Sequence, residues 1–366
     1  MSGNQAKILT SLFACIGFSQ AVMAWNFQGH RVVAQIAYNH LDSEVKAKCD
    51  ALIAIAPPCG TSSGSFVSDS TWADQRCESG TSTQHYINIP ISLDGYPTNG
   101  VPNEPTNVVS AIRQHIVTLQ STNATLTAQA TALRYLIHFV GDIQQPLHCT
   151  TGVTTNRPSG DRGGNDFNLN GTWSNLHSLW DNGGGYLTDG VSVGDKVAAI
   201  EATYPYSASI GSIPDPMDWA VEGWDIARTN TYVGVTAGST PSAAYLNKVQ
   251  STTAQRMAIG GQRLAKLLST IFVTNAPTLT SVTITNDNFA LSWGAVQGRI
   301  YRVQWKQQLD DATWNDLSDI TATTNSVLFT DPILQDQRFY RVIVVNRACR
   351  YWQAPAPLRP RPLGRV

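Results

Sequence analysis

Two His-x-x-x-Asp pairs, each among apolar residues, constrain this chain more than any other feature. The first lies in the stretch YLIHFVGDIQQPLH, where His138 and Asp142 are four residues apart. The apolar residues around them predict a buried helix, on which both side chains project from one face. A buried imidazole and carboxylate need compensation for the water they lose, and a metal ion supplies it. Pro146 then bends the chain, so His148 would reach a second metal.

The second pair repeats the pattern in NLHSLWD. His177 and Asp181 are again four residues apart, with leucines and a tryptophan between and beside them. One such pair alone is more often an accidental surface pair. Two pairs in apolar helical settings, joined by a third histidine, predict a metal centre.

Composition limits where a charged substrate could bind. The chain has 366 residues, enough for two domains, and only 14% of them are charged. Its formal net charge is −1, so no overall positive field attracts nucleic acid. Any binding of phosphate must therefore depend on local charge, which bound metal ions would provide.

Residues 1–24 have the pattern of a secretory signal peptide. Lys7 is their only charged residue, an apolar run follows it, and Ala24 precedes an acceptable cleavage site. A membrane anchor is the alternative, but the run is short and interrupted by polar residues. No later segment is apolar enough to span a bilayer, so we expect a secreted or periplasmic protein.

Cleavage after Ala24 would make Trp25 the first residue. A free α-amino group and the carbonyl of the same residue can chelate a metal, and His30 would complete the site. The alternative is that Trp25 is simply the first core residue. Uncleaved protein would lack the amino ligand.

Export would permit disulfides among the cysteines that follow the leader. Cys49–Cys59 and Cys77–Cys149 are one plausible pairing, but these four cysteines allow three pairings and the sequence does not choose among them. A zinc thiolate at Cys149 is the alternative, although His and Asp ligands already suffice.

Apolar periodicity predicts a nearly all-α domain over 25–273, with no strand pattern of comparable weight before residue 275. The expected helices are 30–53, 106–119, 127–143, 192–206, 216–233 and 241–271.

After Pro277 the pattern changes to short segments that alternate apolar and polar residues. The five segments are SVTIT, FALSW, IYRVQW, SVLFT and FYRVIVV. They predict a small β-sandwich like a fibronectin type III domain over 274–346, with Trp293 and Tyr301 in its core. It contains no catalytic constellation and its ligand is unknown. Residues 347–366 are rich in Pro and Arg and are expected to be a disordered tail.

Two further residues complete the predicted site. Asp74 occurs in SDSTWADQRC and His85 in QHYINIP, and both would join the first pair. Imidazole and carboxylate without thiolate favour catalytic over structural zinc, and there are enough ligands for three zinc ions. Closely spaced zinc ions activate water and clamp phosphate oxygens, so the chemistry points to hydrolysis of phosphoesters.

At this point a resemblance becomes clear. Residues 25 to about 272 resemble the zinc-dependent, single-strand-specific nucleases of fungi and plants and their bacterial relatives. The matching elements are Trp25…Gly29-His30, Trp72-Ala73-Asp74, His85-Tyr86, His138-Phe139-x-Gly141-Asp142-x-x-Gln145-Pro146-x-His148, Gly163-Gly164-Asn165 and Asn175-Leu176-His177-x-x-Trp180-Asp181. The resemblance implies a mainly α fold of the trizinc phospholipase C/nuclease type, and it excludes the C-terminal sandwich.

The resemblance also implies how the ligands divide. One zinc would be held by Asp74, His85, His138 and Asp142. A second would be held by the Trp25 amine and carbonyl, His30 and Asp142, which bridges the pair. A third would be held by His148, His177 and Asp181, with waters completing its shell. Water between the first two ions would attack phosphorus, and the third ion would stabilise the leaving 3′ oxygen.

The implied substrates are single-stranded DNA and RNA, cut to 5′-phosphorylated products, and 3′-nucleotides. Tyr86 matches an aromatic residue that stacks on the base, with a core tyrosine as the alternative. Asn88 stands where relatives carry an Asp that reads the base, so base preference is expected to differ. Asn165 lies in a glycine-containing run that lets backbone approach a ligand.

A second departure concerns the arginine that assists the phosphate in the family. It follows the Asp of the WAD element by three residues in relatives, whereas here that position is Cys77 and the arginine is Arg76. We therefore expect Arg76 to assist catalysis only if it points toward the site.

Two other functions are compatible with these ligands. A bacterial phospholipase C shares the helical trizinc core, but the short spacing from Trp25 to His30, and Asp181 where those lipases carry Glu, argue against it. The other is a non-catalytic module in which zinc only stabilises the fold. The third site has only three protein ligands, which leaves room for water and favours an enzyme, expected to be monomeric.

Overall fold

The computed structural model divides the chain into two compact units, residues 1–273 and 274–366. It describes residues 25–55, 64–75, 80–102, 104–121, 123–207, 209–210, 215–272, 277, 279–285, 288–295, 297, 299–311, 313–332 and 338–344. The expected leader, the expected tail and Arg76 lie outside these residues, so those predictions are not tested by the structure.

The first unit is mainly α, as predicted. Its α-helices in the described residues are α1 (Phe27–Asn39), α2 (Ser43–Ile53), α3 (Val108–Gln120), α4 (Leu126–Asp142), α5 (Leu176–Asp181), α6 (Val193–Thr203), α7 (Pro216–Ile226) and α8 (Ala243–Phe272). Short 3₁₀ turns connect them and carry site residues, among them η2 (Ala73–Gln75), η3 (Ser82–His85) and η4 (Pro146–His148). No described helix is long and apolar enough to cross a bilayer.

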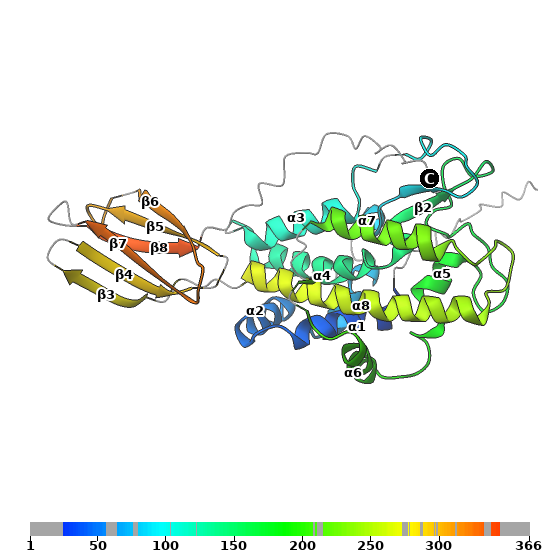
Figure 1. Ribbon diagram of the computed structural model, residues 1–366, viewed down its shortest axis with the longest axis horizontal. Coiled ribbons are helices and arrows are strands. Elements are labelled where there is room, and N and C mark those ends of the chain that lie inside the picture. Colours follow the sequence, from blue (N-terminus) through cyan, green and yellow to red (C-terminus); the bar gives the residue numbers. More distant parts are fainter. Residues whose placement is uncertain are drawn as a thin grey trace, which may run out of the picture. The chain divides into compact units, whose positions relative to one another are not determined.

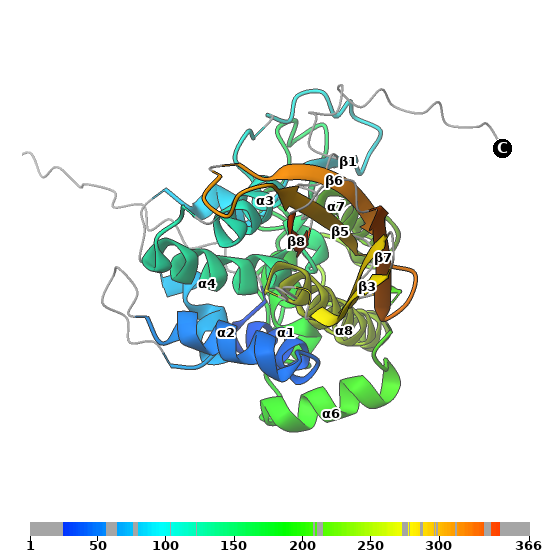
Figure 2. The same cartoon turned by 90° about the vertical axis from the view of Figure 1, so that its left-hand side faces the viewer.

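The central helix of this unit is α4, whose C-terminal half is buried on all sides. It contacts α1, α3 and α8, and the long α8 also lies along α1 (Figures 1 and 2). The α1–α8 contact is close because Gly261 has no side chain, and a Cβ there would lie 2.4 Å from Cγ2 of Ile36. Because the C-terminal half of α4 is buried on every face, the polar side chains there need partners that replace the water they lose.

Two features of the first unit differ from the prediction. The expected helix over 30–53 is two helices, because the chain turns after His40 and Asp42 caps α2 by accepting from the Val45 amide at 2.9 Å. A two-stranded parallel sheet, β1 (Ile89–Ser92) with β2 (Thr150–Val153), was not expected. Each strand has four residues, too few to show an alternating pattern.

The predicted disulfide pairing is wrong for the two cysteines that the structure describes. Cys49 and Cys149 are free and buried, while Cys59 and Cys77 lie outside the described residues. Cys149 instead packs against α7, where a Cβ on Gly223 would lie 2.7 Å from its Sγ. Burial raises the pKa of both thiols to about 12, so neither is poised to act as a thiolate ligand.

The second unit is a β-sandwich, as predicted. One sheet has the order β3 (Leu279–Thr285), β4 (Asn288–Gly294) and β7 (Ser326–Pro332), and the other has β6 (Asn315–Thr321), β5 (Ile300–Lys306) and β8 (Phe339–Val344). Trp293 and Tyr301 are fully buried between the sheets, as expected. Strand β6 was not predicted, because its sequence NDLSDIT is too polar to resemble a half-buried strand.

Candidate metal centre and substrate pocket

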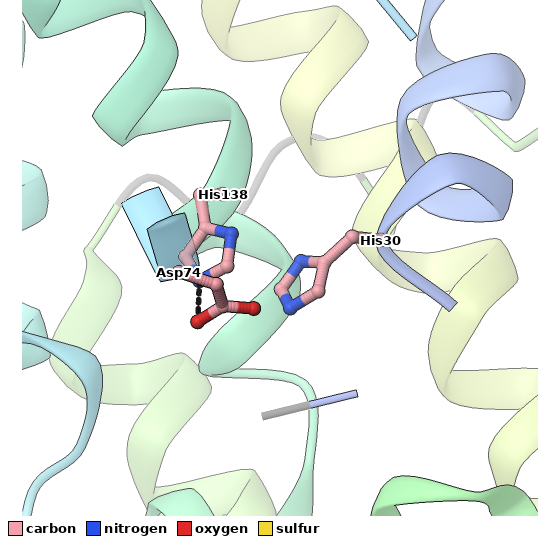
Figure 3. Close-up of side chains that lie close together, drawn as sticks. All are labelled: His30, Asp74 and His138. Carbon is pink, nitrogen blue, oxygen red and sulfur yellow. Dashed lines mark ion pairs between the residues drawn. The ribbon is translucent and has the colours of Figure 1, made fainter. Parts of the chain in front are cut away.

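The structure brings the predicted ligands together from distant parts of the chain. His30 comes from α1, Asp74 from η2 and His138 from α4, and their polar atoms converge (Figure 3). Nε2 of His138 is 3.3 Å from Oδ1 of Asp74. The rings of His30 and His138 stack with their centroids 3.9 Å apart. Gly141 makes this possible, because a Cβ there would lie 2.9 Å from Nδ1 of His30.

Asp142 lies between two groups of histidines. Its Oδ1 is 3.3 Å from Nε2 of His30 and 3.3 Å from Nε2 of His138, and its Oδ2 is 2.9 Å from Nδ1 of His85. His85, His138 and Asp142 form a second cluster of potential ligands that shares His138 with the first. One carboxylate therefore faces both clusters, the position that a bridging ligand requires.

His148, His177 and Asp181 form a third cluster. Nε2 of His148 is 3.2 Å from Nε2 of His177, whose Nε2 is in turn 3.5 Å from Oδ2 of Asp181. The other carboxylate oxygen accepts from the amide of Gln145 at 2.8 Å. The chain turns at Pro146, and His148 therefore lies with His177 and Asp181 rather than with His138 and Asp142.

Backbone carbonyls fix three of the imidazoles. Nδ1 of His138 is 2.7 Å from the Ser70 carbonyl, Nδ1 of His148 is 2.7 Å from the His85 carbonyl, and Nδ1 of His177 is 2.6 Å from the Gly163 carbonyl. A carbonyl only accepts, so each Nδ1 must carry the proton. When the rings are neutral, each Nε2 then directs a lone pair into its cluster, as in metal-binding histidines whose other ring nitrogen donates to a backbone carbonyl.

The spacing of the polar atoms within these clusters suits a bound metal ion better than it suits direct contact between those atoms. Two acceptor nitrogens 3.2 Å apart in the third cluster repel one another. Nitrogens at 2.0–2.1 Å from a tetrahedral zinc would be about 3.3 Å apart. Several buried atoms also have no hydrogen-bond partner in the described structure, which a bound cation would satisfy. They are both ring nitrogens of His30, Oδ2 of Asp74 and Oδ1 of Asp142.

The charges in these clusters are strongly coupled. Burial alone would lower the pKa of His138, but Asp142 and Asp74 reverse this and hold that pKa well above its usual value. Burial would likewise raise the pKa of Asp142, yet His138 holds it well below its usual value. Burial lowers the pKa of His30 to about 3, so this ring is neutral. Burial raises the pKa of Asp181 well above its usual value. A cation would replace the protons on His138 and Asp181.

Trp25 is anchored beside two clusters. Its side chain is fully buried, and its indole N–H donates to the Gly141 carbonyl at 3.1 Å. The next amide, that of Asn26, donates to the Asp181 carbonyl at 3.0 Å. The Trp25 side chain and the following amide are therefore tied to the ends of α4 and α5, where Asp142 and Asp181 lie.

A pocket of about 220 Å³ adjoins the third cluster through His177 and Gly163. Tyr86 and Asn88, which the sequence analysis predicted to bind substrate, line this pocket. The amide of Asn88 donates to Oε1 of Glu104 at 2.9 Å. A carboxylate therefore lies in this pocket although Asn occupies position 88. Burial raises the pKa of Glu104, whose Oε2 is buried with no hydrogen-bond partner.

Asn165 does not line this pocket. Its side-chain amide donates to the Arg162 carbonyl at 2.9 Å, and this hydrogen bond stabilises the loop that contains both residues. Arg162 itself lines the pocket and was not anticipated. Its setting among the glycines of SGDRGGN was the available signal, whereas Glu104 lies in a Pro-rich loop that gave none.

Asp161 is a second residue that sequence reasoning missed. It is buried, and it accepts from the amides of Gly152 at 2.8 Å and Gly164 at 2.9 Å and from the hydroxyl of Tyr232 at 2.9 Å. These bonds fix the loop whose Gly163 carbonyl orients His177.

Comparison with known proteins gives this geometry a family. The family model described as S1/P1 Nuclease matches residues 25–273. Nuclease S1 of Aspergillus oryzae (strain ATCC 42149 / RIB 40) is 27% identical over 300 residues, 72% of this chain and 98% of that protein. Nuclease P1 of Penicillium citrinum is 28% identical over 277 residues, which are 68% of this chain and 97% of that protein. Endonuclease 2 of Arabidopsis thaliana is 27% identical over 293 residues, which are 69% of this chain and 91% of that protein.

Among solved structures, the alpha-toxin of Clostridium perfringens covers 85% of this chain and 84% of its own at 13% identity, with a TM-score of 0.37, which is too low to support any conclusion. The family model spans more than half of the chain and begins at Trp25. This chain therefore belongs to the S1/P1 nuclease family, a family of phosphodiester hydrolases.

Proposed function

We propose that this protein is a zinc-dependent endonuclease that cleaves single-stranded DNA and RNA to 5′-phosphorylated products and also hydrolyses 3′-nucleotides. The observation that carries the proposal is the third cluster, where two carbonyl-fixed imidazoles direct acceptor nitrogens at each other 3.2 Å apart beside an aromatic-lined pocket. Family membership supports the hydrolysis of phosphodiesters, and the donor set supports zinc.

The proposed ligand sets use every residue of the three clusters. Asp74, His85, His138 and Asp142 would hold one Zn²⁺, and the amine and carbonyl of Trp25 with His30 and Asp142 would hold a second. His148, His177 and Asp181 would hold a third. The contacts of Asp142 with His30 on one side and His85 on the other support its role as the bridge.

Bound zinc would supply activated water and would neutralise charge on the phosphate. The residues of the chain prepare the site for this. Asp142 and Asp74 place negative charge where cations must bind, and the Gln145 amide holds Asp181 in position at 2.8 Å. Three protein ligands in the third cluster leave coordination positions for substrate oxygens.

The pocket supports a preference for single strands. Tyr86 lines it and would stack on a base, which does not depend on the base's identity. A base can reach such a wall only when it is splayed out of a helix. Asn88 and Glu104 stand beside it as polar partners for the base edge. All the residues that line this pocket belong to the first unit.

We further propose that the protein is secreted or periplasmic and acts as a monomer. This rests on the leader-like residues 1–24 and on the proposed ligand sets, which need no residue from a second copy of the chain.

Zinc affinity is expected to fall as the pH falls. The proton on His138 stabilises the metal-free fold at low pH, and this contribution is lost as the pH rises through the raised folded pKa. Zinc must displace that proton, and also the proton that Asp181 retains because its pKa is raised. Calorimetry in two buffers of different ionisation enthalpy should show proton release on binding at pH 7. Proton-neutral binding with the same affinity at pH 5.5 and pH 7.5 would contradict this.

Chelation followed by zinc add-back tests the proposed function. The processed protein is incubated with a single-stranded oligonucleotide and, separately, with phosphatidylcholine vesicles. We expect 5′-phosphorylated products that disappear on chelation and return with zinc, while the lipid stays intact. Cleavage of the lipid alone would identify a phospholipase. Cleavage of neither, by protein that begins at Trp25 and contains zinc, would identify a non-catalytic module.

A further inference from the structure

Arg162 has a backbone conformation that an arginine does not favour. Among the residues that the structure describes, it is the one non-glycine residue with a positive φ, at 58°. In this region the Cβ of an L residue crowds the following carbonyl, which glycine avoids. The neighbouring Gly160, Gly163 and Gly164, with φ of 94°, 62° and 79°, meet the same demand with glycine.

The loop needs this backbone shape, but it does not need an arginine to adopt it. The Arg162 amide donates to Oγ1 of Thr151 at 3.1 Å, and the Arg162 carbonyl accepts from Asn165 at 2.9 Å. These are main-chain groups of residue 162, so glycine would offer the same bonds. Strained residues that persist in a fold cluster at functional sites. The reason for arginine here must therefore lie in its side chain.

The side chain of Arg162 is available for a ligand. It is 66% exposed, and its ion pair is a long one, 3.8 Å from Asp166, which is itself partly exposed. Such a pair contributes little to stability. The side chain also lines the pocket with Tyr86 and His177 and is close enough to lower the pKa of the Tyr86 hydroxyl, against burial and Glu104, which raise it.

We propose that Arg162 binds a backbone phosphate next to the scissile one, and so favours polynucleotides over 3′-mononucleotides. This rests on the proposed function. A guanidinium matches a phosphate with two parallel hydrogen bonds. The clusters that would hold the scissile phosphate are buried, whereas Arg162 is exposed at the rim of the pocket. Since the net charge of the chain is −1, a local cation is needed to hold the strand.

The test compares Arg162→Gly and Arg162→Lys with the wild type on two substrates, a single-stranded oligonucleotide and a 3′-mononucleotide. Glycine relieves the backbone, so we expect Arg162→Gly to be at least as heat-stable as the wild type. Its KM for the oligonucleotide should rise about tenfold at unchanged kcat, because one charged hydrogen-bonded contact is lost. Its KM for the mononucleotide should not change. Lysine should restore part of the difference.

Binding of an uncleavable phosphorothioate oligonucleotide gives a readout that does not depend on turnover. The slope of log affinity against log salt should become shallower by about 0.7 in Arg162→Gly, the value for one phosphate on a single strand. Asp166→Asn is the control, because it removes the ion-pair partner of Arg162 without removing the cation; its oligonucleotide KM should not rise.

Equal increases of KM for both substrates would overturn the proposal in favour of a contact with the base or the scissile phosphate. An unchanged KM and an unchanged salt slope would mean that Arg162 contributes only to the conformation of the loop and not to binding. These results are distinct from failure of the proposed function, in which the wild type itself would neither cut nor bind the oligonucleotide.

Discussion

Asp142→Asn is expected to abolish nuclease activity and to remove metal from two sites. The two oxygens of this carboxylate face His30 and His138 on one side and His85 on the other. The substitution removes one negative charge from a fully buried group while keeping its size. An amide is a poor metal ligand, and its N–H₂ would point at a nitrogen or a cation.

The expected loss is at least about a hundredfold in kcat/KM, since changes to groups that only support metal ligands already cost 10–100-fold. Zinc content measured by mass spectrometry should fall from three ions toward one, with the third cluster still filled. Asp225→Asn is the matched control, because Asp225 is an exposed carboxylate that pairs with the exposed Arg228. Full activity and full zinc content in Asp142→Asn would refute the bridging role.

The closeness of some candidate ligands could be predicted because it depends on local geometry. Residues four apart on a helix share a face whatever the rest of the fold does, so His138 with Asp142 and His177 with Asp181 could be paired from the sequence. The apolar residues around them showed that these faces are buried. Asp74 and His85 were expected to join the first pair, but no local pattern joins residues so far apart, and only the family resemblance implied how the ligands divide among the ions.

The parts that could not be predicted depend on contacts between distant segments. Gly141 could be matched to a family motif, but only the fold shows that its missing side chain makes room for the ring of His30. Glu104 and Arg162 become pocket residues only because two loops meet. The strands β1 and β2 are defined by pairing with each other rather than by pattern. The cysteines show the same limit, because Cys149 is enclosed by α7 rather than bonded.

The second large effect is expected at the N-terminus. A protein that begins exactly at Trp25 should bind one more zinc ion, and be at least about a hundredfold more active, than one in which Ala24 is retained or the amine is acetylated. A free α-amino group has a pKa of about 7.7–8.0, so a metal ion readily displaces its proton. An amide nitrogen has no free lone pair to offer, so extension by one residue removes a ligand.

The structure shows why position alone cannot compensate for the lost amine. The Trp25 side chain is fully buried and tied to the Gly141 carbonyl, and the Asn26 amide is tied to the Asp181 carbonyl. An added residue therefore leaves the Trp25 nitrogen in place and changes only its chemistry. Trp25→Phe with an exact terminus is the control, since it keeps the amine while it loses the indole hydrogen bond and part of the buried ring, and it should retain all three ions. If the extended and exact proteins bind equal zinc and cut equally fast, Trp25 is a core residue and not a ligand. If they differ as expected, removal of residues 1–24 is itself the step that completes the metal centre.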